Sequence, residues 1–482
     1  MTLHTEELYQ NSWLERQTFA ENMLPIIGQL FRNNGVEVSI YGRPLVNVSA
    51  IDIIKAHKSV ALHEENKLRL RESFPFVEAL SKMNLAPARI DVGKLSYRYL
   101  FLGEANGLSI EQFLEKELTD ISKQNKQQES KDVVLYGFGR IGRLLARLLI
   151  ERAGPSTQLK LRAIVLRPGN EDDLEKRASL LRRDSVHGAF NGSITIDKEN
   201  NVIKANGAFI QVIYAKSPSE VDYTAYGIND ALLVDNTGIW TDEDGLSQHL
   251  KSKGIAKVLL TAPAKGDIKN IVYGVNQHMI LAEDKIVSAA SCTTNAITPV
   301  LKSLNDQYGI KNGHVETIHS YTNDQNLIDN YHPAPRRGRS APLNMVISTT
   351  GAAKAVSKAL PELEGLLTGN AIRVPTPNVS MAILNLNLKE ETTKDNLNDY
   401  LRSIALKSDL QNQIDYTAST EIVSTDLVGS RYAGVVDSQA TIVDGDRTVL
   451  YVWYDNEFGY SCQVIRVMHE MSGILVPTLP GN

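Results

Sequence analysis

The stretch Asp132-Val133-Val134-Leu135-Tyr136-Gly137-Phe138-Gly139-Arg140-Ile141-Gly142 decides the fold. Its β-branched start predicts a short strand, and its Gly-x-Gly-x-x-Gly spacing predicts a tight turn. Residues 143–152 continue as a helix and residues 161–166 form a second predicted strand. In such a unit the glycines let the backbone approach a pyrophosphate, and the helix N-terminus stabilises that anion. A tight turn without a ligand is the alternative.

Later runs of apolar residues extend this pattern. Residues 231–234, 257–260 and 286–289 predict further strands of a Rossmann-type α/β domain. Residues 381–388 and 448–454 instead alternate apolar and polar side chains, which is typical of an antiparallel sheet with one covered face. We therefore expect a dinucleotide-binding domain followed by an α+β catalytic domain with a mostly antiparallel sheet.

The first 118 residues differ in kind. Apolar residues between positions 13 and 32 recur at helical spacing, and Ser49 is placed to cap a second helix. Further helices are expected near residues 81–85 and over residues 110–118. This composition predicts a mainly helical accessory region that serves oligomerisation or binds a protein partner.

The polar, Gln- and Lys-rich run over residues 119–131 predicts a linker. The expected domains are an accessory region over residues 1–118, a dinucleotide-binding domain over 132–291 completed by a C-terminal helix over 456–474, and a catalytic domain over 292–455.

Length and composition narrow the class of protein. A chain of 482 residues exceeds the size of about 250–300 residues at which one core stops growing, so several domains are expected. The net charge of −5 argues against nucleic acid or an anionic membrane as the main partner. No apolar run reaches the roughly 20 residues that span a bilayer, and no signal peptide is evident, so we expect a cytoplasmic protein.

The pentapeptide Ser291-Cys292-Thr293-Thr294-Asn295 isolates one of only two cysteines among hydroxyl residues at the start of a predicted helix. Two cysteines provide no disulfide framework. A thiol at a helix N-terminus is expected to have a lowered pKa, which would make Cys292 a candidate nucleophile. The alternative is a small buried hydrophobic residue.

His319 ends a predicted strand 319 − 292 = 27 residues after Cys292. If residues 296–308 form a helix and 314–319 return as a strand, the imidazole can lie beside the thiol and move its proton. A histidine with only a structural role is the alternative.

The end of the second predicted strand bears on cofactor choice. A dinucleotide fold usually carries an acid there for the ribose hydroxyls, but this chain has Leu166 followed by Arg167. Without a carboxylate nothing repels a 2′-phosphate, and the guanidinium of Arg167 can pair with one. The cofactor is therefore NAD or NADP, with NADP use favoured. A solvated Arg167 is the alternative.

Six motifs in this order resemble the phosphorylating glyceraldehyde-3-phosphate dehydrogenase family, with an extra N-terminal region. They start at Tyr136, Ser291, His319, Ser348, Arg373 and Trp453, and the similarity covers about residues 132 to 474. The resemblance implies a cysteine nucleophile at Cys292 and a base at His319.

The resemblance also implies the binding residues. The expected cofactor set is Gly137, Phe138, Gly139, Arg140, Ile141, Gly142, Arg167, Thr237, Gly238, Thr261, Asn456 and Tyr460. Thr322 and Arg373 would hold the phosphate of the substrate, and Ser291, Thr293, Thr350 and Gly351 would hold inorganic phosphate. No metal is expected, and a homotetramer is implied.

Three positions depart from the family pattern. Tyr136 replaces an Asn that helps order the glycine loop, Leu166 replaces the ribose-binding Asp, and Ala296 replaces a second Cys. The first two changes lie beside the cofactor, so they leave its identity open.

The expected reaction is the phosphorylating oxidation of glyceraldehyde 3-phosphate to 1,3-bisphosphoglycerate, or its reverse, in glycolysis or gluconeogenesis. A thioester keeps the acyl group activated for phosphate. The alternatives are an erythrose-4-phosphate dehydrogenase, and a scaffold or redox-sensing protein that acts through its N-terminal region.

Overall fold

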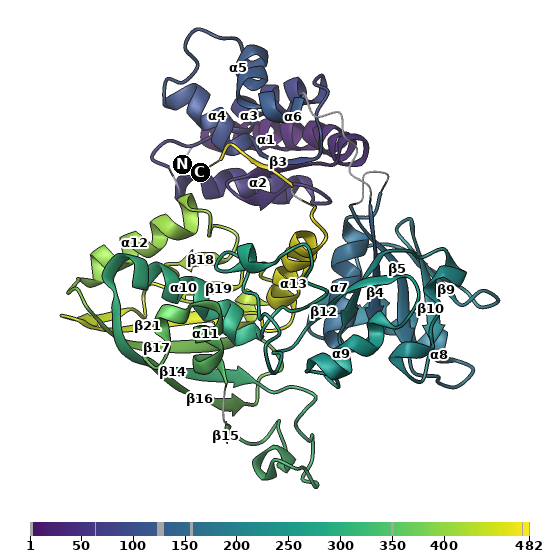
Figure 1. Ribbon diagram of the computed structural model, residues 1–482. Coiled ribbons are helices and arrows are strands. Elements are labelled where there is room, and N and C mark those ends of the chain that lie inside the picture. Colours follow the sequence, from purple (N-terminus) through teal and green to yellow (C-terminus); the bar gives the residue numbers. More distant parts are fainter. Residues whose placement is uncertain are drawn as a thin grey trace. The chain divides into compact units, whose positions relative to one another are not determined.

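The computed structural model describes residues 3–62, 64–122, 130–154, 158–348, 351–474 and 476–481 (Figure 1). The chain forms two compact units. Unit 1 comprises Met1–Ser130, Ala153–Gln158 and Ile474–Asn482, and unit 2 comprises Lys131–Arg152 and Leu159–Gly473.

The first sheet of unit 2 has eight strands in the order β13-β12-β11-β4-β5-β10-β9-β8. The strands from β13 to β10 run parallel, as in a Rossmann fold, and β9 and β8 add an antiparallel edge. Their bounds are β4 (Lys131–Tyr136), β5 (Leu159–Leu166), β8 (Ile194–Asp197), β9 (Val202–Ala205), β10 (Ala208–Tyr214), β11 (Ala231–Asp235), β12 (Ile255–Leu260) and β13 (Ile286–Ser288).

The centre of this sheet is covered on both faces. Every residue of β11 is buried, which explains why its sequence is continuously apolar up to Asp235. The helices of this part are α7 (Arg140–Glu151), α8 (Asp173–Arg182) and α9 (Glu243–Leu250), and a small hairpin joins β6 (Arg183–Asp184) to β7 (Gly188–Ala189).

The second sheet of unit 2 has the order β15-β16-β14-β17-β21-β19-β18, with β20 paired to β21. Most pairs are antiparallel, as expected, but β14 with β16 and β18 with β19 are parallel. The bounds are β14 (Ile310–Ser320), β15 (Val346–Ser348), β16 (Leu367–Val374), β17 (Ser380–Leu388), β18 (Ile414–Thr417), β19 (Gly434–Asp437), β20 (Ile442–Asp444) and β21 (Arg447–Tyr454).

One face of this sheet packs against helices (Figure 1). Alternate residues of β17 are buried, and they form a core with the apolar side of α10 (Cys292–Tyr308). Helices α11 (Ala352–Ala359) and α12 (Lys394–Lys407) add to the same core, and the largely buried α13 (Phe458–Met471) follows β21. The helix and strand expected around the thiol and the imidazole are therefore present as α10 and β14.

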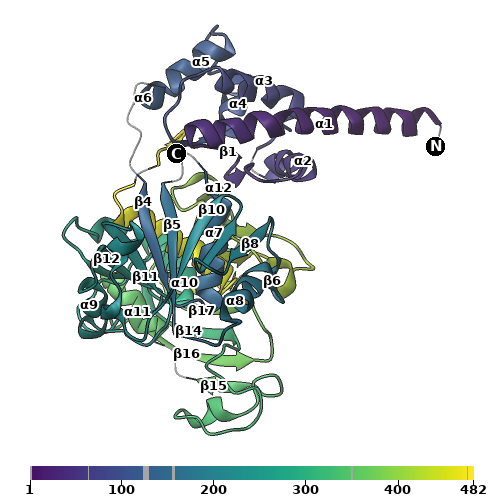
Figure 2. The ribbon, with the colours of Figure 1, turned by 90° about the vertical axis from the view of Figure 1, so that its right-hand side faces the viewer.

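Unit 1 is mainly helical, as expected, and also contains a small sheet that the sequence pattern did not reveal. Its helices are α1 (Leu3–Gln29), α2 (Ala50–Ser59), α3 (Leu70–Ser81), α4 (Val92–Phe101), α5 (Ile110–Glu117) and α6 (Thr119–Ser122). A π-helical turn at Leu30–Asn34 follows α1. Figure 2 shows α1 extending well past the other helices of the unit.

Local signals set the ends of these helices. Ser49 caps α2 as expected, in a capping box with Asp52. The helix placed near residues 81–85 is wrong in position, because α3 begins after Arg69, whose N–H donates to the Glu72 carboxylate at 2.7 Å, and already ends at Ser81. The expected linker begins within α6, and residues 123–129 of it lie outside the described residues.

The sheet of unit 1 has the order β2-β1-β3-β22, with β1 (Val36–Ile40), β2 (Arg43–Pro44), β3 (Ala88–Asp91) and β22 (Thr478–Leu479). Strand β22 comes from the C-terminal tail and runs parallel to β3. Two segments separated by almost the whole chain thus build one sheet. Its strands are short and irregularly spaced, so periodicity alone does not identify them.

Candidate active site

Cys292 is the first residue of α10, and local hydrogen bonds fix this start. The Ser291 hydroxyl caps the helix by accepting from the Thr294 N–H at 3.0 Å. The Asn295 amide donates to the carbonyls of Ala289 and Ser291 at 2.8 and 2.9 Å. The loop that carries the thiol is therefore rigidly held, and Cys292 is only half-buried.

His319 lies near the end of β14 and faces this thiol. Its Nε2 is 3.6 Å from the Cys292 Sγ, and its Nδ1 is 2.7 Å from the Ser320 carbonyl oxygen. We assign the proton to Nδ1, because the Ser320 carbonyl can only accept, and this leaves Nε2 as an acceptor toward the thiol. The guanidinium of Arg373, which can only donate, then makes no hydrogen bond to Nδ1. Residues that lie 27 positions apart in sequence thus form a thiol–imidazole pair.

Burial controls the protonation of this pair. Burial, and next the nearby guanidinium of Arg373, lowers the pKa of His319 to about 3. Burial raises the pKa of Cys292, and Arg373 opposes this rise. The expectation of a lowered thiol pKa is therefore wrong for this structure, because desolvation outweighs the helix N-terminus. The pair consists of a neutral thiol and a neutral imidazole.

Arg373, on β16, is an unpaired cation inside the site. One of its terminal nitrogens lies 2.9 Å from His319 Nδ1 and donates to the Ser320 carbonyl at 3.1 Å. Its Nε is buried without a hydrogen-bond partner, and no carboxylate of the described residues forms an ion pair with it. An orphaned guanidinium donor of this kind suits an anionic ligand.

Tyr454 and Tyr460 hold the backbone and side chains next to the thiol, and of the two only Tyr460 was expected. The Tyr454 hydroxyl is 2.9 Å from Thr293 Oγ1, and its ring meets the His319 ring edge-on. The Tyr460 hydroxyl donates to the Ala290 carbonyl at 2.9 Å. Burial raises the pKa of both phenols, so both remain protonated donors. Tyr454 was missed because it reads as one more inward residue of the alternating β21.

Asn456 is oriented by a serine that also touches the histidine strand. The Ser380 hydroxyl donates to Asn456 Oδ1 at 2.9 Å and accepts from the Ser320 N–H at 3.0 Å. The amide nitrogen of Asn456 has no partner among the described residues. A fixed amide with a spare donor can bind the oxygen of a carboxamide.

The three glycines of the loop after β4 have separate roles. Gly137 has φ +91°, which favours glycine, and a Cβ on Gly142 would lie 2.4 Å from the Gly137 carbonyl oxygen. A Cβ on Gly139 would meet nothing within 4 Å. The first and third glycines thus serve the turn and the packing, and the second leaves open space where a pyrophosphate can approach the start of α7.

The carboxyl ends of β11 and β12 lie beside this loop in the sheet. Asp235 accepts from the N–H and hydroxyl of Thr237 at 2.8 and 2.7 Å, and the Thr261 hydroxyl donates to the Asp235 carbonyl at 3.0 Å. Gly238 has φ +66°. Parallel sheets bind ligands at this edge, so Thr237, Gly238 and Thr261 occupy suitable positions for a dinucleotide.

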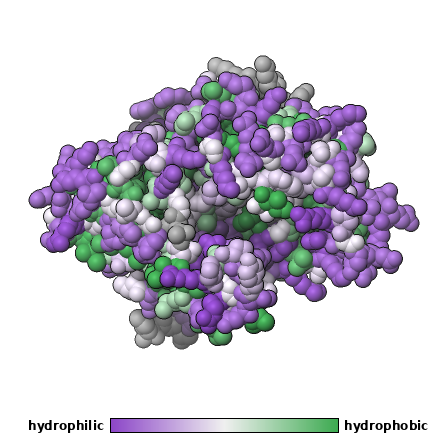
Figure 3. Space-filling model, turned by 60° about the horizontal axis from the view of Figure 1, so that its bottom comes forward, coloured by the Kyte–Doolittle hydropathy of each residue, from purple (hydrophilic) through white to green (hydrophobic). Residues whose placement is uncertain are grey.

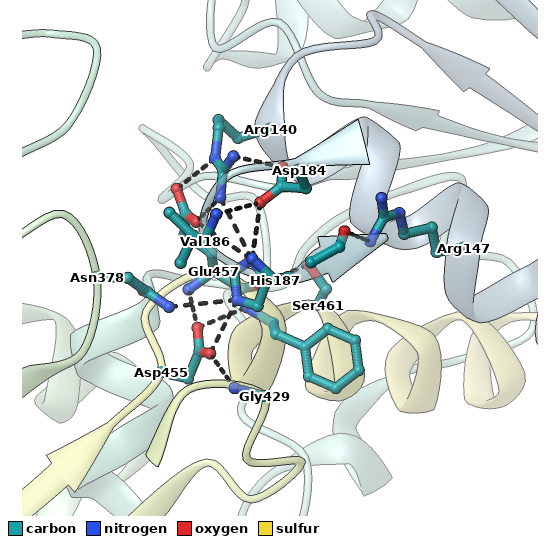
Figure 4. A network of polar contacts seen from close by, with 12 residues as sticks. Arg140, Arg147, Asp184, Val186, His187, Asn378, Gly429, Asp455, Glu457 and Ser461 are labelled. Carbon is teal, nitrogen blue, oxygen red and sulfur yellow. Dashed lines mark hydrogen bonds and ion pairs between the residues drawn. The ribbon is translucent and has the colours of Figure 1, made fainter. Parts of the chain in front are cut away.

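Arg140 is held by carboxylates (Figure 4). It donates through Nε to Glu457 at 2.8 Å, forms a second contact to the same carboxylate, and pairs with Asp184 at 2.5 Å. His187 lies in the same network, with Nε2 3.0 Å from Asp455. The resemblance implied a place for Arg140 beside the pyrophosphate, but the sequence did not reveal these partners, which lie 44 to 317 positions away.

Asp455 fixes the turn that contains Asn456. It accepts from the N–H groups of Glu457 and Phe458 at 2.9 and 2.8 Å and from the Gly429 N–H at 2.8 Å. The network in Figure 4 therefore joins the glycine-loop helix to the segment that carries the spare amide donor.

The remaining expected residues are more scattered. Thr322 follows β14 and Gly351 directly precedes α11, whose N-terminus suits an anion, while Thr350 lies outside the described residues. Leu166 is buried at the end of β5, and Arg167 beside it is exposed and joins none of the clusters above.

Among the described residues no helix is long and apolar enough to cross a membrane. Within the same part of the chain, no group of three or more His, Cys, Asp or Glu side chains is arranged to hold a metal ion.

Known families and relatives match the same segments. The model of the glyceraldehyde 3-phosphate dehydrogenase NAD binding domain matches residues 131–243, and that of the C-terminal domain matches residues 291–456. A glyceraldehyde-3-phosphate dehydrogenase-like protein of Pseudomonas aeruginosa is 63% identical over 462 residues, which is 95% of this chain and 100% of the relative.

Two further relatives match a shorter part of the chain. Glyceraldehyde-3-phosphate dehydrogenase of Zymomonas mobilis is 39% identical over 71% of this chain and 99% of its own length. The chloroplastic glyceraldehyde-3-phosphate dehydrogenase A of Zea mays is 40% identical over 69% of this chain and 80% of its own length. The match to the Pseudomonas relative therefore extends over the N-terminal region, whereas the matches to the other two relatives cover a shorter segment of this chain.

Proposed function

Because the chain belongs to the glyceraldehyde-3-phosphate dehydrogenase family, we propose that it converts glyceraldehyde 3-phosphate and inorganic phosphate to 1,3-bisphosphoglycerate, or the reverse. It is an oxidoreductase that uses NAD or NADP. The observation that carries the proposal is the thiol–imidazole pair of Cys292 and His319 at 3.6 Å, beside the orphaned guanidinium of Arg373.

The reaction begins at the thiol. The Cys292 sulfur attacks the aldehyde carbon while its proton passes to His319 Nε2, and the product is a hemithioacetal. The low pKa of His319 keeps Nε2 free to accept, and the Ser320 carbonyl holds the opposite nitrogen as a donor. The developing alkoxide takes this proton back from His319 Nε2, so the imidazole is neutral again and the charge in the pocket is conserved.

Oxidation then produces an acyl-enzyme. A bound nicotinamide would supply the acceptor for the hydride that leaves the hemithioacetal carbon. His319 takes the hydroxyl proton as that hydride leaves, and Cys292 then carries a thioester. The spare donor of Asn456 and the nearby Tyr460 are suited to orient the carboxamide and ring of the cofactor.

Phosphate completes the turnover. A phosphate oxygen attacks the thioester carbonyl, the acyl phosphate leaves, and the thiol regains its proton. We propose that Arg373 and Thr322 hold the phosphate of the substrate, while Ser291, Thr293, Thr350 and Gly351 hold the attacking phosphate. The buried Arg373 donor and the N-terminus of α11 at Gly351 support this assignment.

Replacement of the nucleophile tests the proposal. Cys292→Ser should abolish phosphate-dependent formation of reduced cofactor, because a hydroxyl is a far weaker nucleophile than a thiol. Cys462→Ser is the matched control, since this second thiol is buried in α13 and should leave turnover unchanged. Full activity of Cys292→Ser would refute the proposal.

We consider a second substrate because the Pseudomonas relative is named only as glyceraldehyde-3-phosphate dehydrogenase-like. Oxidation of erythrose 4-phosphate would use the same thiol and imidazole, and without a phosphate acceptor water would have to release the thioester. A rate that depends on added phosphate supports the phosphorylating reaction. A rate that is insensitive to phosphate, with erythrose 4-phosphate as the better substrate, would replace it.

The choice between NAD and NADP rests on Leu166 and Arg167. We propose that NADP is accepted, because the strand end carries no acid and the exposed guanidinium is available for a 2′-phosphate. Arg167→Ala should then lower kcat/KM for NADP and leave NAD almost unchanged. Equal kcat/KM values in the variant and the parent for NADP would remove Arg167 from this role.

We also propose a cytoplasmic homotetramer that serves glycolysis or gluconeogenesis. Exposed apolar side chains around β15 support subunit contacts, since Leu327, Tyr331, Leu343 and Met345 are 67 to 87% exposed. Figure 3, which brings that end of unit 2 forward, shows hydrophobic patches among hydrophilic residues. Light scattering of the purified chain measures the oligomer size.

A further inference from the structure

Unit 1 contains a cavity of about 570 Å³ that has no part in the dehydrogenase site. The cavity is lined by side chains from three segments: α1 (12–19), the second half of α2 with the turn after it (54–61), and the segment that leads into α3 (67–71). Ligand pockets have volumes of about 300–1,000 Å³, so this cavity has the size of a small-molecule site.

The rim of this cavity is strongly cationic. Five of its thirteen lining residues are basic and one is acidic; the basic residues are Arg16, Lys58, Lys67, Arg69 and Arg71, and the acid is Glu15. The single carboxylate pairs with Arg71 at 3.4 Å. The excess of positive charge contrasts with the chain's net charge of −5.

Two of these cations have no partner. Neither Lys58 nor Lys67 donates a side-chain hydrogen bond or forms an ion pair among the described residues. Arg69 reaches Glu72 only at 3.9 Å. Unpaired cations on one rim repel each other, and a bound polyanion removes that repulsion.

The floor of the cavity is apolar and partly aromatic. Ile54, Leu68 and Leu70 are at most 3% exposed, and the half-buried Phe19 packs against Phe74 with ring centroids 5.4 Å apart. The polar floor residue is already satisfied, because His57 makes hydrogen bonds of 2.8 and 2.7 Å to Ile53 and Ser73. The floor can therefore take a flat apolar body but adds no charge to it.

We propose that this cavity binds a nucleoside di- or triphosphate, with its base over the Phe19 floor and its phosphates at the Lys58 and Lys67 rim. A hollow of this volume with an apolar floor favours a small molecule over an extended anionic surface such as a membrane. The cavity lies in unit 1 and the dinucleotide loop in unit 2. Nucleotide binding in the cavity is therefore a separate property of the chain and does not depend on the proposed dehydrogenase activity.

The test is calorimetric titration of the full chain with ATP, adenosine and inorganic triphosphate, in the presence of saturating NADH and NADPH. The reduced cofactors keep ATP from the glycine loop. ATP should bind more tightly than either fragment, and binding should weaken as salt rises. Equal affinity of ATP and adenosine, or of ATP and triphosphate, would overturn the proposal.

Charge-neutral variants localise the binding. Lys58→Gln combined with Lys67→Gln should lower ATP affinity at least about tenfold, because two charge-assisted contacts are lost. Lys82→Gln is the matched control, since this exposed lysine caps α3 away from the cavity. Both lysines are exposed, so the double variant should keep the parent melting temperature and KM for the dinucleotide. Unchanged ATP affinity in the double variant would also overturn the proposal.

Discussion

At the scale of single residues, the pair formed by Cys292 and His319 shows how burial determines chemistry. The sequence indicated a helix-capped thiol with a lowered pKa, and the cap by Ser291 is present. The thiol pKa is nevertheless raised, because desolvation depends on packing that brings β14 and β21 over the helix start. The position could be inferred from the sequence, whereas the balance between burial and charge could not.

Arg373 lets this balance be measured. Its positive charge lowers the pKa of Cys292, so Arg373→Gln should raise this pKa and move the pH midpoint of thiol alkylation upward. The measurement is the rate of iodoacetamide labelling against pH without cofactor. Arg373→Lys restores the charge and should bring the midpoint back. A midpoint that moves down in Arg373→Gln would contradict this electrostatic role.

Asp184 gives a second residue-scale prediction, on stability against pH. Burial alone raises the pKa of Asp184, but the N–H of His187 and the guanidinium of Arg140 outweigh it, and the pKa falls from 3.8 to about 2. A lowered carboxyl pKa stabilises the fold above about pH 4, and this contribution is lost as the pH falls toward 2.

Asp184→Asn should therefore lower the free energy of unfolding near pH 7 by about 1 kcal/mol, after allowance for solvent screening, and the difference should shrink at pH 2–3. Urea unfolding at several pH values measures it. Asp399→Asn, an exposed position on α12, is the control and should show no such trend. A difference that grows in acid would be inconsistent with the network.

At the scale of elements, the glycine loop was the most predictable part of the chain. Gly137, Gly139 and Gly142 occur between a strand and a helix at a fixed spacing, and β4 and α7 follow it closely. The long-range contacts of the same helix were not predictable. Arg140 meets Asp184 and Glu457 because β6 and the start of α13 pack beside α7, and no local pattern records that packing.

Two alanine variants separate packing from ligand approach in this element. Gly142→Ala should cost about 1–3 kcal/mol of stability, because its Cβ would lie 2.4 Å from a backbone oxygen. Gly139→Ala should cost less than about 1 kcal/mol of stability, because its Cβ would contact no atom of the described residues. The same Cβ would occupy the space where the pyrophosphate approaches, so NAD binding should weaken at least about tenfold. Urea unfolding and calorimetric titration with NAD measure the two effects. The reverse assignment of effects would refute the separate roles.

At the scale of the whole molecule, the division into units was only partly visible in the sequence. The polar run at residues 119–131 marks the place where the mainly helical region gives way to the dinucleotide fold. The tail was placed with the dinucleotide-binding part through the helix over 456–474, and α13 does lie in unit 2. Residues from Ile474 onward belong to unit 1, because β22 pairs with β3 in the sheet of that unit. The sequence did not predict this sheet, since its strands carry no long alternating pattern.

Removal of this tail should therefore affect unit 1. In a chain that ends at Gly473, the Arg89 N–H loses its acceptor, the Pro477 carbonyl at 2.8 Å, and β3 becomes an edge strand. Amide hydrogen exchange over residues 88–91 should become much faster. Thr478→Ala keeps the backbone of β22 and is the control, with exchange close to that of the parent. Unchanged exchange in the shortened chain would show that β22 adds nothing to the sheet.

The position of β22 also imposes an order on biosynthesis. A ribosome delivers the helices of unit 1 first, then all of unit 2, and only afterwards the strand that borders β3. The first unit to emerge is thus the last to be finished, and the edge of β3 stays open throughout translation of the enzyme core. Because β22 follows every catalytic residue in the sequence, it can pair with β3 only after all of those residues have been translated.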